Sequence, residues 1–426
     1  MIPSYSIQSF EEKFLSKQKA SLEDTTIIEI AKQVINDIRE NGDKALSKYV
    51  EQFDNYVPID FEVSNKEREQ AWDEVDPDTI TSLKLAADNI RDFHKQQLSS
   101  SRFMNVGEEV VSGQLFRPIE RVGIYVPGGT ACYPSSVLMN AIPAVLAGVE
   151  EVIMVTPARN GENIAPILSV AADIAGVSKI LKIGGIQAIA ALAYGTETIS
   201  NVDKIVGPGN AYVAAAKSLV YGDVGIDMIA GPSEVAIIAD QTANPIYIAA
   251  DLIAQAEHDE NARAFLFSTS DQLIKETKME LERQCSNLPR REIAEKALKN
   301  KSSCVLVSDI TQAFELSNRL APEHLEVQVE SPLNYLGKVK NAGSVFLGNY
   351  TPEALGDYFA GPNHVLPTSG TARFSSGLSV DDFIKKTTFL YYSQQALDDA
   401  AQHVVNIATE EQLEGHARAV QKRLNK

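Results

Sequence analysis

The stretch Ala321-Pro322-Glu323-His324-Leu325-Glu326 places a carboxylate next to an imidazole behind a proline. Adjacent side chains point apart on a helix or a strand, but both can enter one cleft from a loop that follows Pro322. An imidazole with an ordinary pKa of about 6.5 suits a general base at neutral pH. Glu323 could orient His324 or activate a water molecule by itself. The alternative interpretation is a solvated surface loop.

A second candidate string is Asp251-Leu-Ile-Ala-Gln255-Ala-Glu-His258-Asp259. Gln255 and His258 are three residues apart, so they share one face of a helix. Histidine is the commonest side-chain metal ligand, and a glutamine oxygen suits a hard or borderline divalent ion. The string therefore indicates part of a metal site. The alternative is a helix end at which His258 interacts with the helix dipole.

A long glycine- and proline-rich segment at 355–373 carries Asp357 and His364. A segment of this length without a hydrophobic period is usually functional or disordered. Asp357 could supply a carboxylate to a metal, and His364 could contact an anionic group of a substrate. A turn residue and a solvated imidazole are the alternatives. Glu411 and His416 are five residues apart on the expected last helix, and their spacing alone indicates only a solvated helix.

Three glycine-rich turns follow expected strands and precede expected helices, at residues 125–129, 182–185 and 206–210. In an open parallel sheet, ligands bind beyond the carboxyl ends of the strands, where such turns let backbone approach a phosphate or a ribose. None of the three matches GxGxxG, so they indicate a nucleotide site without the usual dinucleotide fingerprint. Tight strand-to-helix turns without a ligand are the alternative.

The composition limits the class of protein. A chain of 426 residues predicts two to three domains, and its net charge of −18 argues against nucleic acid or an anionic membrane as a partner. Cys132, Cys285 and Cys304 show no metal-binding spacing, which favours a reducing compartment. We see no secretory signal and no apolar run of about 18 residues. A cytoplasmic location is therefore expected.

Alternating strand and helix patterns predict an α/β fold with two Rossmann-like parallel-sheet domains, a helical N-terminal arm and a helical C-terminal tail. In the first run we expect strands at 122–126, 151–155, 179–183 and 204–206, and helices at 135–147, 164–175, 187–194 and 210–220. In the second run we expect strands at 234–239, 264–268, 304–307, 325–329 and 343–347, and helices at 245–258 and 311–320. Before these runs, helices are expected at 27–40, 43–53 and 76–97.

The pattern changes again at Val380. Three helices are expected there, at 381–386, 393–407 and 409–424, the last opened by a capping box at Thr409. This tail is too small to bury a core alone, so it must dock on its own body or on a neighbouring chain.

Together the strings resemble the histidinol dehydrogenase family along nearly the whole chain. The matching strings, in order between residues 123 and 417, are GIYVPGG, GGIQAIAALAYGT, VGPGNAYV, AGPSE, DLIAQAEHD, APEHLE, GDYFAGPNHVLPT and EGHA. The resemblance implies a four-electron oxidation of L-histidinol through L-histidinaldehyde to L-histidine, the end of histidine biosynthesis. Two NAD molecules would be used in succession.

The resemblance also implies a role for each matching residue. The residues that match zinc ligands, one ion per subunit, are Gln255, His258, Asp357 and His416. The residues that match the catalytic pair are Glu323 and His324. Those that match substrate contacts, besides the zinc ligands and His324, are Ser233, His364 and Glu411. Those that match NAD contacts are Tyr125, Gln187 and Asn210. Mn²⁺ could replace Zn²⁺ in such a set of oxygen and nitrogen donors.

The same resemblance implies the domain plan. Residues 1–24 would form the arm, 25–121 with 233–379 a discontinuous domain with the metal and catalytic residues, and 122–232 the NAD-binding domain. In this family the C-terminal helices cross to the partner subunit. Residues 380–426 would then complete the neighbour's site with Glu411 and His416 in a homodimer.

In the mechanism that the resemblance implies, His324 takes the hydroxyl proton while hydride leaves to NAD, and Glu323 then activates water. We expect a pKa near neutrality for such a proton shuttle.

Three other functions remain open at this point. Cys132 follows the first glycine turn, where a thiolate would be activated, so a cysteine-dependent aldehyde dehydrogenase is one. A metal- or nucleotide-binding regulatory protein is the second, although the Glu-His pair argues against it. A dehydrogenase for another amino alcohol or a sulfonated diol is the third, and Gln255, Glu411 and the EGHA string favour histidinol over it.

Overall fold

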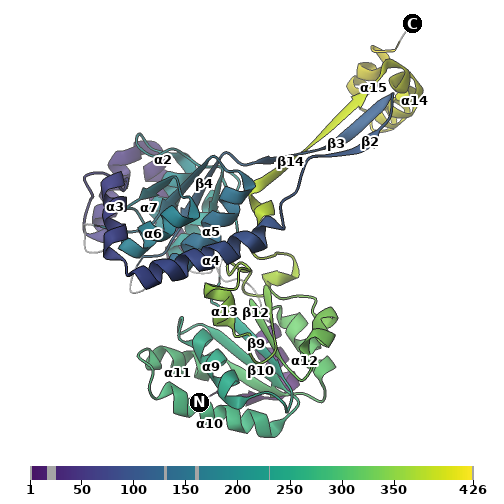
Figure 1. Cartoon of the computed structure of the whole chain (residues 1–426). Coiled ribbons are helices and arrows are strands. Elements are labelled where there is room, and N and C mark those ends of the chain that lie inside the picture. Colours follow the sequence, from purple (N-terminus) through teal and green to yellow (C-terminus); the bar gives the residue numbers. More distant parts are fainter. Residues whose placement is uncertain (1, 17–24, 129–131, 159–162, 230, 425–426) are drawn as a thin grey trace.

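The computed structural model describes residues 2–16, 25–128, 132–158, 163–229 and 231–424. Two parallel sheets form two bodies, and an antiparallel sheet forms an arm that projects from one of them (Figure 1). The expected α/β class with two Rossmann-like sheets is confirmed. In the described residues, no helix is both long and apolar enough to span a membrane.

The first body is built on a five-stranded parallel sheet with the order β6-β5-β4-β7-β8. Its strands are β4 (Arg121–Tyr125), β5 (Glu151–Val155), β6 (Lys179–Leu181), β7 (Lys204–Val206) and β8 (Gly225–Ile226). The connecting helices are α5 (Pro134–Ala147), α6 (Pro166–Ala175), α7 (Gly185–Tyr194) and α8 (Ala211–Val220). The predicted elements agree within two residues at each end. The chain reverses its direction across the sheet between β4 and β7, which creates a topological switch point there.

The early helices α2 (Thr25–Asp54), α3 (Asn65–Glu74) and α4 (Pro77–Lys95) also belong to this body. Buried side chains of α2 share a core with α7 and α8, and those of α4 share one with α5. The expected grouping of residues 25–121 with 233–379 therefore does not match the packing, because the apolar faces of these helices lie on the five-stranded sheet. The interruption predicted between the helices at 27–40 and 43–53 is present, since Gly42 has a non-helical φ of 51° inside α2.

The second body contains a six-stranded parallel sheet with the order β1-β11-β10-β9-β12-β13. Its strands are β1 (Ser4–Tyr5), β9 (Glu234–Ala239), β10 (Arg263–Ser268), β11 (Ser303–Leu306), β12 (His324–Gln328) and β13 (Ser344–Leu347). Its helices are α9 (Pro245–Ala256), α10 (Asp271–Cys285), α11 (Arg291–Asn300), α12 (Ile310–Leu320) and α13 (Glu353–Tyr358). Short 3-10 helices follow at Pro332–Lys338 and Thr371–Arg373. The order reverses between β9 and β12, so this sheet has a switch point as well.

The N-terminal segment differs from the expected helical arm. Its first element is strand β1, which pairs in parallel with β11, and only then do the short helices α1 (Ile7–Phe10) and η1 (Glu11–Leu15) follow. Residues 17–24 of the expected arm lie outside the described part of the chain. Phe10 is fully buried and meets the rings of Phe265 and Phe267 edge-on at 5.5 and 5.2 Å. The segment is thus part of the core of the second body.

The projecting arm consists of β2 (Arg102–Val106), β3 (Val110–Pro118) and β14 (Ile384–Tyr392), and its tip carries α14 (Gln394–Glu410) and α15 (Glu414–Gln421) (Figure 1). The helix predicted at 381–386 is wrong. A 3-10 turn at Val380–Phe383 leads directly into β14, whose threonine and aromatic residues pair with β3 at nine positions. The capping box at Thr409 is also wrong, because Thr409 lies in the last turn of α14 and donates to the Val405 carbonyl.

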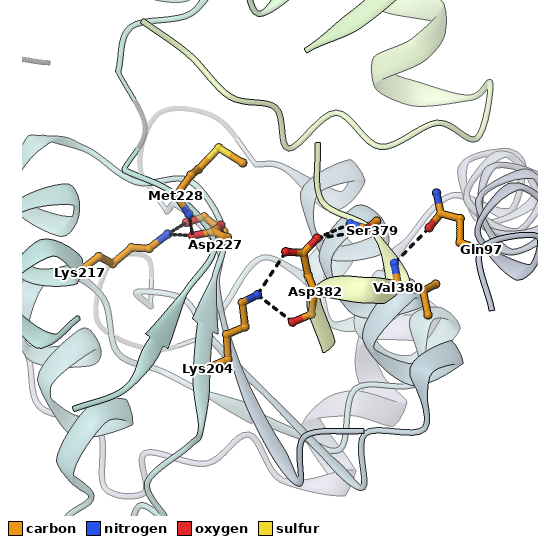
Figure 2. Close-up of polar contacts among 9 residues, drawn as sticks. Gln97, Lys204, Lys217, Asp227, Met228, Ser379, Val380 and Asp382 are labelled. Carbon is orange, nitrogen blue, oxygen red and sulfur yellow. Dashed lines mark hydrogen bonds and ion pairs between the residues drawn. The ribbon is translucent and has the colours of Figure 1, made fainter. Parts of the chain in front are cut away.

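The base of the arm is fixed to the five-stranded sheet by Lys204 and Asp382 (Figure 2). Lys204 Nζ donates to the Asp382 carbonyl at 2.7 Å and lies 3.3 Å from its carboxylate. That carboxylate accepts from the Ser379 amide at 2.8 Å. The amide of Val380 donates to Gln97 Oε1 at 3.1 Å. These contacts tie β14 to β7 and to the segment after α4, which sets the direction in which the arm leaves the body.

The first prediction concerns the N-terminal segment. Phe10→Ala removes a ring that is buried among aromatic side chains, so we expect it to lower the free energy of unfolding by about 3–5 kcal/mol. Urea denaturation measures this loss. Met279→Ala is the matched control, because this side chain is 70% exposed, and its effect should stay within about 0.5 kcal/mol. Equal effects of the two substitutions would show that the segment is not part of the core.

Candidate active site

A cavity of about 290 Å³ lies between the two bodies. On one side its walls include Pro127 and Gly207, which follow β4 and β7 at the carboxyl edge of the five-stranded sheet. On the other side they include Ser233 and His324, which lie at the amino ends of β9 and β12. Both switch points therefore border the cavity. The five-stranded sheet presents the carboxyl ends of its strands to the cavity, where a ligand was expected, whereas the six-stranded sheet presents its amino ends.

The predicted Glu-His pair points into this cavity. Glu323 and His324 are 6% and 4% exposed, and both line the wall. The chain enters β12 at His324, so Glu323 lies just outside the strand and is free of its alternation. The Glu323 carboxylate accepts a hydrogen bond from the Glu234 amide at 3.0 Å. Burial raises the pKa of Glu323 well above its usual value.

The tautomer of His324 follows from the atoms around Nδ1. This nitrogen lies 3.3 Å from the Glu234 carbonyl and 3.2 Å from Gln255 Oε1, and both of these are acceptors. Nδ1 therefore carries the proton, and Nε2 keeps the lone pair. Burial lowers the pKa of His324 to about 3, further than the near-neutral value expected from the sequence. The imidazole is thus neutral at pH 7 and able to accept a proton.

Glu353 is a site residue that the sequence analysis missed. It is 3% exposed, and its carboxylate lies 3.4 Å from His324 Nδ1. Asp357 follows one turn later on α13. One carboxylate oxygen of Glu353, one of Asp357 and one imidazole nitrogen of His324 all lie within 4.8 Å of one another, close enough to hold a metal ion together. The signal was the four-residue spacing of the two acids, but it was hidden because Asp357 was placed in a loop at 355–373 and no helix was expected at Glu353.

Of the four predicted zinc ligands, three meet at the cavity. Gln255 at the end of α9, His258 just after it and Asp357 on α13 all line the wall. Burial lowers the pKa of His258 and raises that of Asp357 to about 7. His416 is not among the residues that line the cavity, because it lies on α15 at the tip of the arm, and Glu411 caps α14 there (Figure 1).

His364 links the two bodies at the cavity wall. Its Nδ1 lies 3.0 Å from the Asp357 carbonyl, and its Nε2 lies 3.3 Å from Ser136 Oγ at the start of α5. Burial lowers the pKa of His364 to about 4, so this ring is neutral as well. Ser233 also lines the cavity, as predicted, whereas the contact of Ser136 was not foreseen.

The residues that match NAD contacts lie beside the cavity instead of in its described lining. Tyr125 ends β4, and its hydroxyl accepts from the Gly185 amide at 3.1 Å. Gln187 is 1% exposed in the first turn of α7, and Asn210 caps α8 through its side chain. All three lie at the carboxyl edge of the five-stranded sheet, where the turn at 206–210 contributes Gly207 and Gly209 to the cavity. Gly129 of the first turn lies outside the described residues.

The cysteines give the covalent alternative no support. Cys132 packs against the hydrophobic core of the first body and is not among the described residues that line the cavity. Cys285 and Cys304 are buried in the second body, and burial raises the pKa values of their thiols to about 11 and about 12. All three cysteines are free thiols.

Comparisons with known proteins agree with this arrangement. A family model described as histidinol dehydrogenase matches residues 17–424. A histidinol dehydrogenase of Bacillus cereus (strain ATCC 10987) is 54% identical over 415 residues, which cover 96% of each chain. One of Streptococcus mutans is 50% identical and covers 98% of this chain and 96% of its own. A crystal structure of histidinol dehydrogenase from Elizabethkingia anophelis has a TM-score of 0.93 at 41% identity, and covers 99% of this chain and 98% of its own.

The second prediction concerns Asp357 in chelator-treated protein. Because burial raises its pKa from the usual 3.8 to about 7, the folded protein holds this proton more tightly than the unfolded chain. The stability contributed by the protonated Asp357 is therefore lost as the pH rises from the pKa of the unfolded chain, about 4, to that of the folded protein, about 7. Relative to Asp357→Asn, the wild type should lose roughly 2 kcal/mol between about pH 5 and about pH 8.

Urea denaturation of both proteins across this pH range measures the difference. The nearby histidines titrate in both proteins, so their contributions cancel when the two curves are subtracted. Parallel curves would contradict the buried carboxyl group.

Proposed function

We propose, since this chain belongs to the histidinol dehydrogenase family, that it oxidises L-histidinol through L-histidinaldehyde to L-histidine with two molecules of NAD. It is an enzyme of histidine biosynthesis. The observation that carries the detailed proposal is the burial of Glu323 and His324 in the same cavity as Gln255, His258 and Asp357. The three free cysteines favour the reducing cytoplasm as its compartment.

The donor set at the cavity fits a divalent ion, with Zn²⁺ as our proposal and Mn²⁺ as a substitute. Gln255, His258 and Asp357 offer an amide oxygen, an imidazole nitrogen and a carboxylate, which is a borderline set. A cation beside Asp357 would also offset the cost of burying this carboxylate. Bound there, the ion would supply a Lewis-acid anchor that orients the imidazole and amine of the substrate. His416 from a second copy would be the fourth ligand.

The proton transfers fall to His324 and Glu323. In the first step, Nε2 of neutral His324 accepts the proton of the substrate hydroxyl, while NAD receives the hydride. His324 then releases this proton to solvent. In the second step the Glu323 carboxylate, which a nearby cation would keep ionised, takes a proton from the water that adds to the aldehyde, and His324 accepts the proton of the hydrate as NAD receives the second hydride. Glu353 keeps the ring of His324 in place from the Nδ1 side, 3.4 Å away.

The five-stranded body is the NAD-binding part in our proposal, and the six-stranded body supplies catalysis. Glycine is required in these turns by the packing of the sheet edge, since a Cβ on Gly207 would lie 2.2 Å from the Tyr125 carbonyl oxygen and one on Gly128 would lie 2.3 Å from Pro157. The turns follow the carboxyl ends of β4 and β7, which is where open parallel sheets bind ligands. Tyr125, Gln187 and Asn210 surround these turns at the same sheet edge. We assign them to NAD binding.

The tip of the arm supports a homodimer with shared sites. Within α14 and α15 the buried residues are only alanines, at 401, 408 and 417. Val404, Ile407 and Leu413 are exposed there by 41%, 62% and 43%. Such a tip cannot stabilise itself and exposes an apolar surface that a second copy can cover. Docking on that copy would bring Glu411 and His416 to its cavity. The net charge of −18 argues against nucleic acid and membrane partners.

The third prediction is the yield of NADH. The purified enzyme should form two equivalents per L-histidinol, and almost none after chelation, with recovery on addition of Zn²⁺ or Mn²⁺. Absorbance of NADH at limiting histidinol measures the ratio. A yield of one equivalent, or activity that survives chelation, would refute the proposal, and an amino alcohol without the imidazole serves as the control substrate.

The fourth prediction tests the shared site by mixing two inactive variants. His258→Ala removes a residue of the cavity wall, and His416→Ala removes one at the tip of the arm. If the tip serves the partner, each mixed dimer has one intact site and one doubly defective site. After unfolding and refolding together, activity should return to roughly one quarter of wild type, because about half of the dimers are mixed.

The control mixture combines His258→Ala with Gln255→Ala, both in the cavity wall, and should stay inactive. If the tip served its own subunit, the His258→Ala and His416→Ala mixture would also stay inactive, and the exchange of tails would be refuted.

A further inference from the structure

Gly207 lies at the switch point of the five-stranded sheet and is enclosed by its neighbours. Its φ of 106° falls in the region that favours glycine. A side chain there would collide with Tyr125, since a Cβ would lie 2.2 Å from the Tyr125 carbonyl oxygen and 3.2 Å from its amide nitrogen. Gly207 at the end of β7 therefore packs directly against Tyr125 at the end of β4, and it lines the cavity.

Lys217 and Asp227 bind both polar atoms of the Gly207 backbone. Lys217 Nζ donates to the Gly207 carbonyl at 3.0 Å, and Asp227 Oδ2 accepts from the Gly207 amide at 2.8 Å. The two side chains also form an ion pair, in which they point toward one another beside Met228 (Figure 2). The Met228 amide donates to Asp227 Oδ1 at 2.6 Å. Gly207 is thus held through its carbonyl by α8 and through its amide by the end of β8.

The burial of this pair distinguishes it from the surface ion pairs of the chain. The side chains of Lys217 and Asp227 are 4% and 2% exposed. Removing two charges from water is costly, and such pairs add little to stability compared with apolar residues of the same size. A hypothesis that accounts for them is conformational specificity, in which the charges select one backbone arrangement. Here the selected arrangement is that of the turn at Gly207.

Both residues line the cavity together with Gly207, Pro208 and Gly209. Because the ammonium and the carboxylate neutralise each other, the pair presents no net charge to a ligand. Lys217 also lies on α8, whose first turn is capped by Asn210 at the end of the same glycine-rich turn. The geometry therefore places the pair behind the turn at 206–210, as its support.

We propose that Lys217 and Asp227 are positioning residues that hold the turn at 206–210 in its NAD-binding conformation and so set the affinity for NAD. The inference rests on the proposed role of this turn in NAD binding. It adds two residues to the cofactor side of the site, and neither belongs to the proton-transfer group. Loss of the pair should therefore weaken NAD binding and leave the histidinol side unchanged.

The test compares Lys217→Met with the double variant Lys217→Met/Asp227→Asn in the metal-loaded dimer. The single variant leaves a buried carboxylate without its cation and is expected to be less stable, whereas the double variant leaves no unpaired charge and should be the more stable of the two. In both, the KM for NAD and the Kd for NADH should rise about tenfold. The KM for histidinol, and kcat at saturating NAD, should change less than about twofold.

Arg68→Met is the matched control. Arg68 pairs with Asp173 and also donates to the carbonyls of Val177 and Ser178, so it resembles Lys217 in combining an ion pair with carbonyl contacts in the same body. It does not line the cavity in the described residues. Its substitution should lower the melting temperature without changing the Kd for NADH.

Three outcomes would overturn the inference. One is an unchanged Kd for NADH in the folded double variant. The second is an equal rise in the KM values for NAD and histidinol, and the third is the same rise in Arg68→Met, since either of these two would indicate a general loss of packing. Failure of the wild type to form NADH from histidinol would instead refute the proposed function, so the two failures are distinguishable.

Discussion

Desolvation of ionisable side chains where the two sheets face each other is the constraint on which the site depends. Glu323, His324, Glu353 and His364 are all taken out of water there, which raises the pKa values of the carboxyl groups and lowers those of the imidazoles. Burial thus favours the neutral form of every group. A neutral imidazole is a base that needs no prior deprotonation, and carboxyl groups that resist ionisation gain most from a nearby cation.

Glu326, the last residue of the stretch 321–326, connects strand β12 to helix α13 next to this site. It is 1% exposed, and its Oε1 accepts from the Glu353 amide at 3.1 Å at the start of α13. Its Oε2 accepts from Gln328 at 2.8 Å. Strand β12 carries His324 and helix α13 carries Asp357, so one buried carboxylate sets the distance between the proposed base and a proposed metal ligand. The Lys217–Asp227 pair has the corresponding position on the opposite wall. Each wall is therefore held by buried polar side chains that bind the backbone next to the proposed reacting groups.

The arm obeys a different constraint, since β14 pairs with β3 at nine positions along its length while its tip buries almost nothing. The ion pair of Lys204 with Asp382 fixes only its base. A rigid stalk with an uncovered apolar tip is stable only where another surface receives it. In the proposed homodimer the site and the quaternary structure would be two aspects of one arrangement, because the tip carries Glu411 and His416, which match the family's site.

The sequence by itself determined the alternating elements of both sheets, the break at Gly42 and the candidate residues Glu323, His324, Gln255, His258 and Asp357, because apolar periodicity, glycine and local spacing are properties of short segments. It did not determine that α2 and α4 cover the five-stranded sheet, that residues 384–392 form a strand or that Glu353 adjoins His324. Those features depend on contacts between residues far apart in the chain, such as the pairing of β14 with β3, and no local pattern encodes them. No local pattern encodes the meeting of the two switch points either, one of which is presented by carboxyl ends of strands and the other by amino ends. The order of strands in each sheet is decided only when distant segments pack, and that order makes the cavity.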